Sequence, residues 1–206
     1  MVVCIIYLLY IMNFDPDDLF QGEDNLEYLY NITKILKVDV ITFAFLQNNK
    51  TKLKCLNYNK ILKQPQLFQS TFDDLKCIFD DVLWNKLVKR KLMLKVYDFF
   101  KNKIYSEKWN YGEDTIWSIL INKYAKSKFC INKIIYIYKS NNDSLLHLKW
   151  SKIELDNKIS FIKMFSEILK NNDEKNYIIS NLFLSLSELY NQNLLLLKNN
   201  NESNIK

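Results

Sequence analysis

Two groups of carboxylates in this chain have the spacing and surroundings of residues that could bind a cation or move a proton. Asp15, Asp17 and Asp18 directly follow an apolar run, in the stretch FDPDD. Alternating carboxylates in a tight turn at the end of a strand can hold a hard divalent cation through oxygen. The ordinary alternative is a structural turn, because proline fixes φ and aspartate bonds its own backbone.

Glu113 and Asp114 form the second group, between Gly112 and an amphipathic run. A carboxylate in such a place can take a proton from an attacking hydroxyl group. The structural alternative is the start of a helix, where acids interact favourably with the helix dipole and glycine eases the entry of the chain. Taken singly, neither group decides between chemistry and structure.

The elements that must position these carboxylates are expected to be alternating strands and helices. We predict strands over residues 1–12, 38–46 and 129–139, and helices over about 24–36 and 114–125. Asp24 is suited to cap the first of these helices. Strand, acidic turn, helix and strand in this order are typical of an α/β sheet, so the predicted fold class is α/β.

From Trp150 onward the pattern changes to long helical stretches, interrupted once at KNNDEK. We expect a first domain over residues 1–148, a helical extension over 149–198 and a disordered tail over 199–206. The segment between residues 47 and 79 gives no clear pattern.

Composition argues against several classes of function. The net charge is +6, but the lysines are scattered among 23 acids, so no nucleic-acid partner is predicted. The apolar start is too short to span a bilayer and lacks the features of a signal peptide. The four cysteines are far apart with no CxxC pair. We therefore expect free thiols in a reducing, cytoplasmic compartment rather than a zinc site or a disulfide framework.

Four segments, taken together and in order, resemble the second half of a family 2 glycosyltransferase with a GT-A fold. They are FDPDDLF, LEYLYNITKILKVDVITFAF, LWNKLVKRKLM and GEDTIWSILINKYAKSKFCINKIIYIYKSNNDSL. The resemblance covers residues 7 to 145, approximately. It implies an α/β fold with a partial GT-A mixed sheet and helices, followed by a C-terminal helical segment.

The resemblance also implies roles for both groups of carboxylates. Asp15 and Asp17 match the acids of the family's DxD motif, which bind Mn²⁺ or Mg²⁺ and, through the cation, the diphosphate of a nucleotide-sugar such as a UDP-sugar. Asp114 matches the general base of an inverting transfer, with Glu113 beside it. Gly112, without a side chain, would let the acceptor approach Asp114.

The donor-binding residues that the resemblance implies are Asp18, Trp84, Lys86 and Arg90. A core tryptophan and surface cations explain the last three of them equally well. In the family, strands and helices ahead of the DxD motif hold the nucleotide base, whereas 14 residues precede Asp15 here. The chain thus resembles a member truncated at its N-terminus.

The predicted function is transfer of a sugar from a nucleotide-sugar to a hydroxyl of a saccharide or lipid-linked acceptor, as in polysaccharide biosynthesis. The alternative is a non-catalytic remnant or interaction domain with a GT-A-like core, in which the acids serve as turns and caps. The partners implied are the nucleotide-sugar and the glycan or lipid-linked acceptor. The sequence allows both peripheral membrane association and a homo-oligomer and decides neither.

Overall fold

The computed structural model of this chain describes residues 2–6, 9–47, 50–52, 59–68, 82–103 and 113–139. The chain divides into two compact units, Met1–Lys149 and Trp150–Lys206, and every described residue belongs to the first. The helical extension and the tail predicted from the sequence lie outside the described residues, as does Gly112.

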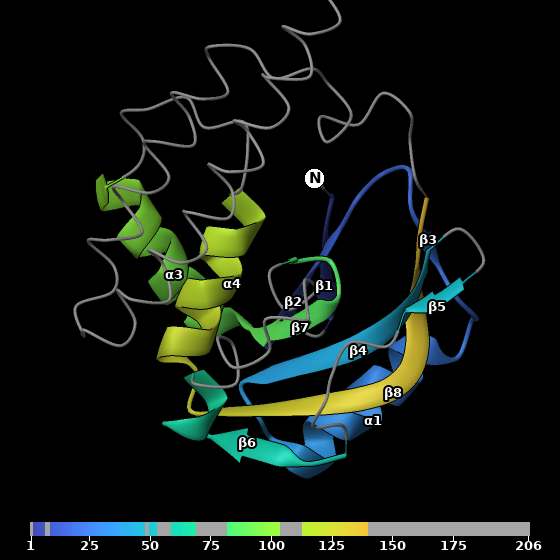
Figure 1. The fold of residues 1–206 in the computed structure, drawn as a ribbon, viewed down its shortest axis with the longest axis horizontal. Coiled ribbons are helices and arrows are strands. Elements are labelled where there is room, and N and C mark those ends of the chain that lie inside the picture. The colour runs from blue at the N-terminus through green and yellow to red at the C-terminus, as the bar shows by residue number, and fades with distance from the viewer. Residues whose placement is uncertain are drawn as a thin grey trace, which may run out of the picture. The chain divides into compact units, whose positions relative to one another are not determined.

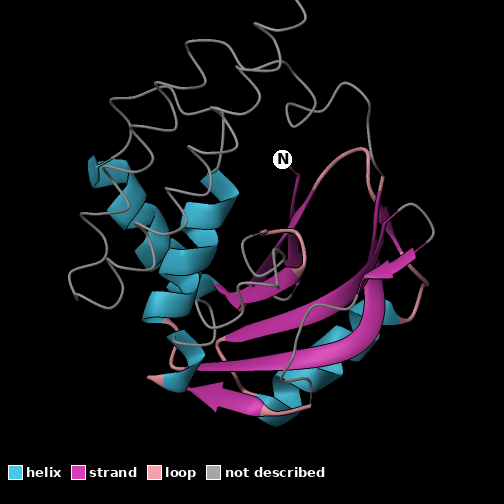
Figure 2. Ribbon diagram, viewed as in Figure 1, coloured by secondary structure: helices cyan, strands magenta, loops and turns pink. Residues whose placement is uncertain are grey.

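The described residues form a mixed eight-stranded sheet accompanied by helices (Figures 1 and 2). The strands are β1 (Val2–Ile6), β2 (Tyr10–Phe14), β3 (Leu19–Phe20), β4 (Val40–Gln47), β5 (Lys50–Lys52), β6 (Ile61–Lys63), β7 (Lys86–Lys89) and β8 (Ser127–Tyr138). The helices are α1 (Asn25–Leu36), α3 (Arg90–Lys103) and α4 (Glu113–Tyr124). The order across the sheet is β1-β2-β7-β4-β8-β3, with β5 paired to β4 and β6 paired to β8. The predicted α/β class with a mixed sheet is confirmed.

Three strands, β2, β4 and β8, run in the same direction. β4 pairs in parallel with β8, and β7 pairs antiparallel with both β2 and β4. The ends of these three strands lie at one edge of the sheet, here named the carboxyl edge, and their beginnings lie at the other, the amino edge. Helix α1 returns the chain from the carboxyl edge to the start of β4.

The apolar run at the start of the chain forms two strands, and the prediction of a single parallel strand is wrong. β1 pairs antiparallel with β2, with Val2 opposite Phe14 and Ile6 opposite Tyr10. An uninterrupted apolar run has no periodicity that would reveal where the chain reverses. A hairpin also brings both strands into one sheet without a crossover connection.

Helix α1 buries an apolar stripe against one face of the sheet. Leu29 is fully buried in a core with Ile41, Phe43 and Phe45 of β4. The helix begins at Asn25, close to the prediction, but the side chain of Asp24 makes no cap hydrogen bond, so Asp24 is not the predicted side-chain cap. Packing of the apolar stripe, rather than capping, therefore fixes this helix.

Helices α3 and α4 pack against each other. The rings of Phe100 and Trp117 stack with centroids 4.3 Å apart, and Ile116 and Leu120 are fully buried on the inner side of α4. Both α4 and β8 begin and end within two residues of the predicted bounds. In the part of the chain that the structure describes, no helix is long and apolar enough to cross a lipid bilayer.

Cys130, near the start of β8, is fully buried and disulfide-bonded. The expectation of free thiols is therefore wrong for this residue.

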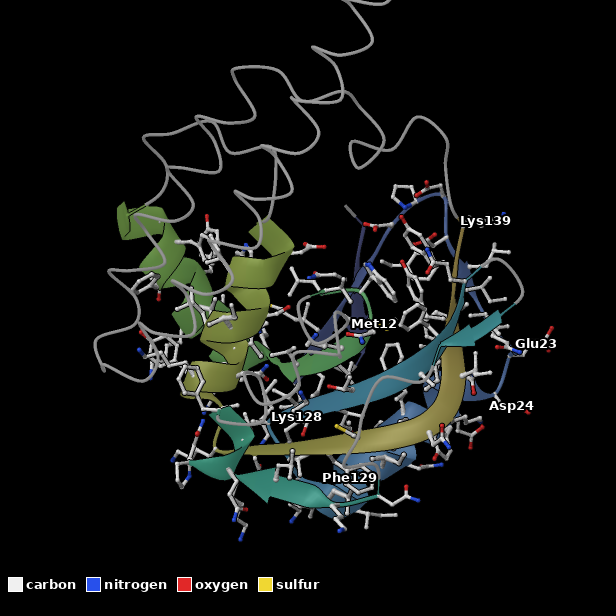
Figure 3. All side chains as sticks on the ribbon, viewed as in Figure 1. Met12, Glu23, Asp24, Lys128, Phe129 and Lys139 are labelled. Atoms are coloured by element: carbon white, nitrogen blue, oxygen red, sulfur yellow. The ribbon has the colours of Figure 1, made fainter. Side chains whose placement is uncertain are left out.

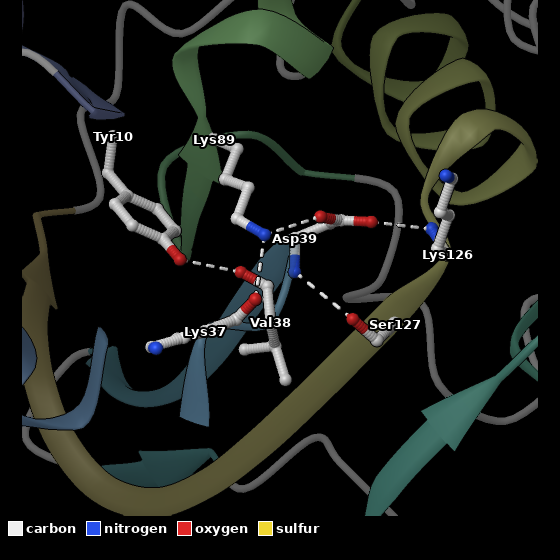
Figure 4. Close-up of polar contacts among 7 residues, drawn as sticks. All are labelled: Tyr10, Lys37, Val38, Asp39, Lys89, Lys126 and Ser127. Atoms are coloured by element: carbon white, nitrogen blue, oxygen red, sulfur yellow. Dashed lines mark hydrogen bonds and ion pairs between the residues drawn. The ribbon is translucent and has the colours of Figure 1, made fainter. Parts of the chain in front are cut away.

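Asp39 ties three strands together at the amino edge (Figure 4). Its Oδ1 accepts a hydrogen bond from Lys89 Nζ at 2.8 Å, and its Oδ2 accepts one from the Lys126 backbone N–H at 2.7 Å. Its own N–H donates to the Ser127 carbonyl oxygen at 3.1 Å. Burial raises the pKa of Asp39, but the bonds from Lys89 and Lys126 outweigh it and hold the pKa below its usual value.

Replacing Asp39 with asparagine is expected to lower the free energy of unfolding at pH 7 by about 2 kcal/mol, because a charge-assisted bond to Lys89 is lost. The folded-state pKa lies below the unfolded one, so the carboxylate stabilises fully above about pH 4, the unfolded value. This contribution is lost as the pH falls through the folded-state pKa. Urea unfolding of both proteins at pH 7 and in acid checks this. The difference between them should shrink in acid, and an undiminished difference would contradict the assignment.

Candidate functional site

The three aspartates of FDPDD form a turn across the carboxyl edge, here named the aspartate turn (residues 15–18). The Asp18 N–H donates to the Asp15 carbonyl oxygen at 3.1 Å, the bond that closes a β-turn. Since β2 and β3 lie on opposite sides of β4 and β8 in the sheet order, the turn must cross the ends of those strands. Asp15 is half-buried, Asp17 is exposed and Asp18 is only 4% exposed. One short motif thus holds three carboxylates in three different environments.

Strand β8 anchors the turn through Asp18. The Tyr136 hydroxyl donates to Asp18 Oδ2 at 2.5 Å, and the Lys139 backbone N–H donates to Asp18 Oδ1 at 2.8 Å. Figure 3 labels Lys139 at the end of this strand. Burial raises the pKa of Asp18, and the two hydrogen bonds oppose this rise without cancelling it. The Asp18 side chain is therefore buried in the protein interior, with both carboxylate oxygens hydrogen-bonded.

The hydroxyl of Tyr136 holds both ends of the aspartate turn. Besides donating to Asp18, it accepts a hydrogen bond from the Asp15 backbone N–H at 3.3 Å. Burial, followed by the bond to Asp18, raises the pKa of Tyr136, which keeps the hydroxyl protonated as a donor. No role was predicted for Tyr136 from the sequence. A signal was present, because alternation in IIYIYK places Tyr136 and Tyr138 on one face near the end of a strand.

Trp84 lies behind the turn, within a stack of aromatic rings. Its ring stacks on Tyr136, with centroids 4.8 Å apart and planes 15° apart, and on Tyr138 at 5.4 Å. The ring of Phe45 meets it edge-on at 4.5 Å. Trp84 is 7% exposed, so it supports the ring that holds Asp18 instead of facing a ligand.

Lys86 is fully buried at the start of β7. Its ammonium group donates to Asn85 Oδ1 at 3.1 Å and to the Val82 carbonyl oxygen. These bonds join β7 to the segment that carries Trp84. Among the described contacts, Lys86 thus fixes the backbone on either side of Trp84 and does not touch the aspartate turn.

Arg90 lies at the other end of β7, at the amino edge. Its side chain is exposed, and its N–H donates to the Leu9 carbonyl oxygen at 2.7 Å. β7 runs opposite to β4, so Trp84 lies toward the carboxyl edge and Arg90 does not. Of the residues that the resemblance assigned to the donor, Asp18 and Trp84 both contact Tyr136, whereas Arg90 lies at the amino edge.

Glu113 and Asp114 are the first two residues of α4. Asp114 is half-buried. The carboxyl end of α4 leads directly into β8 at the amino edge, and a helix of 12 residues is about 18 Å long. In Figure 1 the start of α4 and the end of β8 both point toward the upper side of the view. Asp114 thus stands a helix length away from the amino edge.

The aspartate turn fits a cation that arrives with a phosphate ligand better than one held by protein alone. Among the described residues, no group of three or more His, Cys, Asp or Glu side chains has the arrangement of a metal site. Since Asp18 is bonded to Tyr136 and Lys139, at most Asp15 and Asp17 of the turn face a ligand. Magnesium is commonly held by one or two carboxylates together with substrate phosphates.

Comparison with known proteins bears on the fold. No protein-family profile matches the chain, and no curated protein matches its sequence. Among solved structures, the chain is similar to residues 1–349 of TarS from S. aureus, crystallised with UDP-GlcNAc. The TM-score is 0.54 at 16% sequence identity, over 82% of this chain and 45% of the TarS chain. TarS is a glycosyltransferase.

The chain has a glycosyltransferase-like fold. At 16% identity the likeness concerns the fold alone, and the chain spans less than half of the TarS chain that it matches. Membership of family 2 and the roles of individual residues stay predictions.

Proposed function

We propose that the chain is a family 2 glycosyltransferase that uses a nucleotide-sugar, with a UDP-sugar as the donor. One observation carries this proposal: the aspartate turn lies at the carboxyl edge, where α/β sheets bind ligands, with Asp18 anchored inward and Asp17 exposed. The glycosyltransferase-like fold supports it, as does the UDP-GlcNAc bound to TarS. The acceptor is a hydroxyl of a saccharide or of a lipid-linked glycan.

The proposed roles follow from the environment of each residue. Asp15 and Asp17 hold the donor diphosphate by way of Mn²⁺ or Mg²⁺, which when bound neutralises the charge on the leaving diphosphate. Asp18 fixes the direction of the turn, supported by Trp84 and Lys86. Arg90 is left out of the proposed donor site, because it lies at the amino edge.

Asp114 is the proposed general base, which takes the proton of the acceptor hydroxyl as it attacks. A carboxylate opposite the leaving group is what an inverting transfer requires. Glu113 stands beside it, and Gly112 gives the acceptor room.

A non-catalytic role has its own support. The bonds from Tyr136 and Lys139 to Asp18 would shape the aspartate turn even without a ligand. In that interpretation the carboxylates cap and turn the chain, and the protein serves as an interaction domain.

β1 ends the described sheet, and such an edge strand favours a homo-oligomer. A cytoplasmic location with peripheral membrane association completes the proposal.

Calorimetric titration of the protein with UDP, with and without Mn²⁺, distinguishes the two readings. We expect UDP to bind at least tenfold more tightly with Mn²⁺, roughly the contribution of one charge-assisted contact, and Mn²⁺ alone to bind weakly. Asp17→Asn should remove the Mn²⁺ effect.

Asp24→Asn is the matched control, because Asp24 is equally an exposed aspartate and makes no cap hydrogen bond. It should bind UDP as the wild type does. A folded wild type that binds no UDP, or an unchanged Mn²⁺ effect in Asp17→Asn, would defeat the proposed donor site.

A further inference from the structure

Cations that are scattered in the sequence gather at the amino edge of the sheet. Four separate segments contribute: the end of α1, the end of β6, the junction of β7 with α3, and the link between α4 and β8. The cations there are Lys37, Lys63, Lys89, Arg90, Lys91 and Lys126. All of them are exposed except Lys89, which is partly buried.

Contacts between backbone and side chains bring these segments together. Lys89 Nζ donates to the Lys37 carbonyl oxygen at 2.7 Å, and Lys63 lies opposite Ser127 in the pairing of β6 with β8. The acid described among these segments, Asp39, is already paired with Lys89 at 2.8 Å. The opposite edge carries the aspartate turn, so these cations and the aspartate turn lie at different edges of the described sheet.

Two aliphatic side chains protrude beside these cations. Leu9 is 70% exposed, and its carbonyl oxygen accepts the bond from the Arg90 N–H. Ile35, in the last turn of α1, is 76% exposed. They are the most exposed large hydrophobic side chains in the described residues. Cations surrounding protruding aliphatic groups are typical of a surface that rests on anionic lipid.

The two cations at the start of α3, Arg90 and Lys91, do not stabilise this helix. Arg90 and Lys91 stand at the helix N-terminus, and the first turn contains no acid. The helix dipole favours acids in this place and disfavours cations. These charges therefore reduce the stability of the helix, which is consistent with a function in binding.

We propose that the amino edge, defined by its five exposed cations (Lys37, Lys63, Arg90, Lys91 and Lys126) together with Leu9 and Ile35, docks the protein on an anionic lipid bilayer. A nucleic acid would pair with the cations but would offer Leu9 and Ile35 no apolar partner. At this edge the described residues also present no exposed aromatic ring for bases to stack on. Docking through this edge directs the aspartate turn away from the lipid. The proposal depends on the contacts at this edge and not on transferase activity.

Sedimentation with lipid vesicles tests the proposal. We expect the chain to bind vesicles of equimolar phosphatidylglycerol and phosphatidylcholine, to bind vesicles of phosphatidylcholine weakly, and to lose affinity as salt rises. Each cation near an anionic surface contributes roughly fivefold in affinity, so Arg90→Glu/Lys91→Glu should weaken binding at least about thirtyfold. The helix dipole favours both new acids, so this variant should be no less stable to urea than the wild type.

Lys60→Glu/Lys101→Glu is the control, with the same change in charge at exposed lysines that precede β6 and end α3. It should keep most of the vesicle binding. Leu9→Ser/Ile35→Ser should weaken vesicle binding. Equal loss in both charge variants, no preference for phosphatidylglycerol, or unchanged vesicle binding by Leu9→Ser/Ile35→Ser would each overturn the proposal.

Discussion

Replacing Asp114 with asparagine is expected to slow sugar transfer by about 10²–10⁴-fold and to leave the affinity for UDP unchanged. Asparagine has nearly the shape of aspartate but cannot accept the proton of the acceptor hydroxyl. It is also tolerated in the first turn of a helix, so α4 should form as before. Transfer from a panel of UDP-sugars to a panel of saccharide acceptors measures the first quantity, and calorimetry with UDP and Mn²⁺ measures the second.

Asp98→Asn provides the matched control for this loss. Asp98 is an exposed aspartate in α3, the helix that packs against α4. Its replacement by asparagine makes the same change in charge as Asp114→Asn. Transfer should be unaffected. Turnover that survives in Asp114→Asn would reject Asp114 as the base. Loss of UDP affinity in that variant would instead assign Asp114 to the donor.

Removing the Tyr136 hydroxyl is expected to weaken the proposed donor site, because this hydroxyl holds the aspartate turn in place from the protein interior. In Tyr136→Phe the ring can still stack on Trp84, but Asp18 loses its 2.5 Å bond and the Asp15 N–H loses its acceptor. An unsatisfied buried group costs about 1–3 kcal/mol, so the free energy of unfolding at pH 7 should fall by that amount. The turn is then no longer fixed, and Mn²⁺-dependent UDP binding should weaken at least about tenfold.

The pH dependence of this variant has a definite sign. The pKa of Asp18 is already raised in the folded protein by burial. A raised carboxyl pKa means that the folded state binds the proton more tightly, so stability falls as the pH rises from the unfolded pKa through the folded one. Without the Tyr136 bond the pKa should rise further. Tyr136→Phe should therefore be most destabilised at neutral pH and closest to the wild type in acid, by urea unfolding.

Tyr10→Phe separates stability from function. Tyr10 is also a buried tyrosine, and its hydroxyl donates to the Val38 carbonyl oxygen at 2.7 Å at the amino edge, as Figure 4 shows. Its loss should reduce stability to a comparable extent but leave UDP binding intact. If Tyr10→Phe and Tyr136→Phe weaken UDP binding equally, Tyr136 has only a structural role. If neither variant changes binding, the aspartate turn is not the donor site.

Four of the eleven described elements, α1, β4, α4 and β8, could be predicted from the sequence to within two residues. The α1, α4 and β8 segments repeat or alternate apolar residues with one period, and β4 is rich in β-forming residues and too short for a helix. The opening hairpin could not, since a continuous apolar run has the same pattern whether or not it reverses. The disulfide at Cys130 was missed for a related reason, because cysteine spacing along the chain does not indicate which thiols are close in space.

The aspartate turn and its place after a strand could also be predicted from the sequence, because proline and aspartate favour a turn through local bonds alone. Only the tertiary structure decided which aspartate is exposed. Tyr136 lies more than a hundred residues beyond Asp18, and its hydroxyl turns that carboxylate inward. The same pairing of distant strands put Trp84 behind the turn, sent Arg90 to the amino edge and gathered dispersed lysines into one surface. Local periodicity sets which segments become strands, whereas burial, charge and exposure depend on which strands lie side by side, and that is a property of the folded sheet.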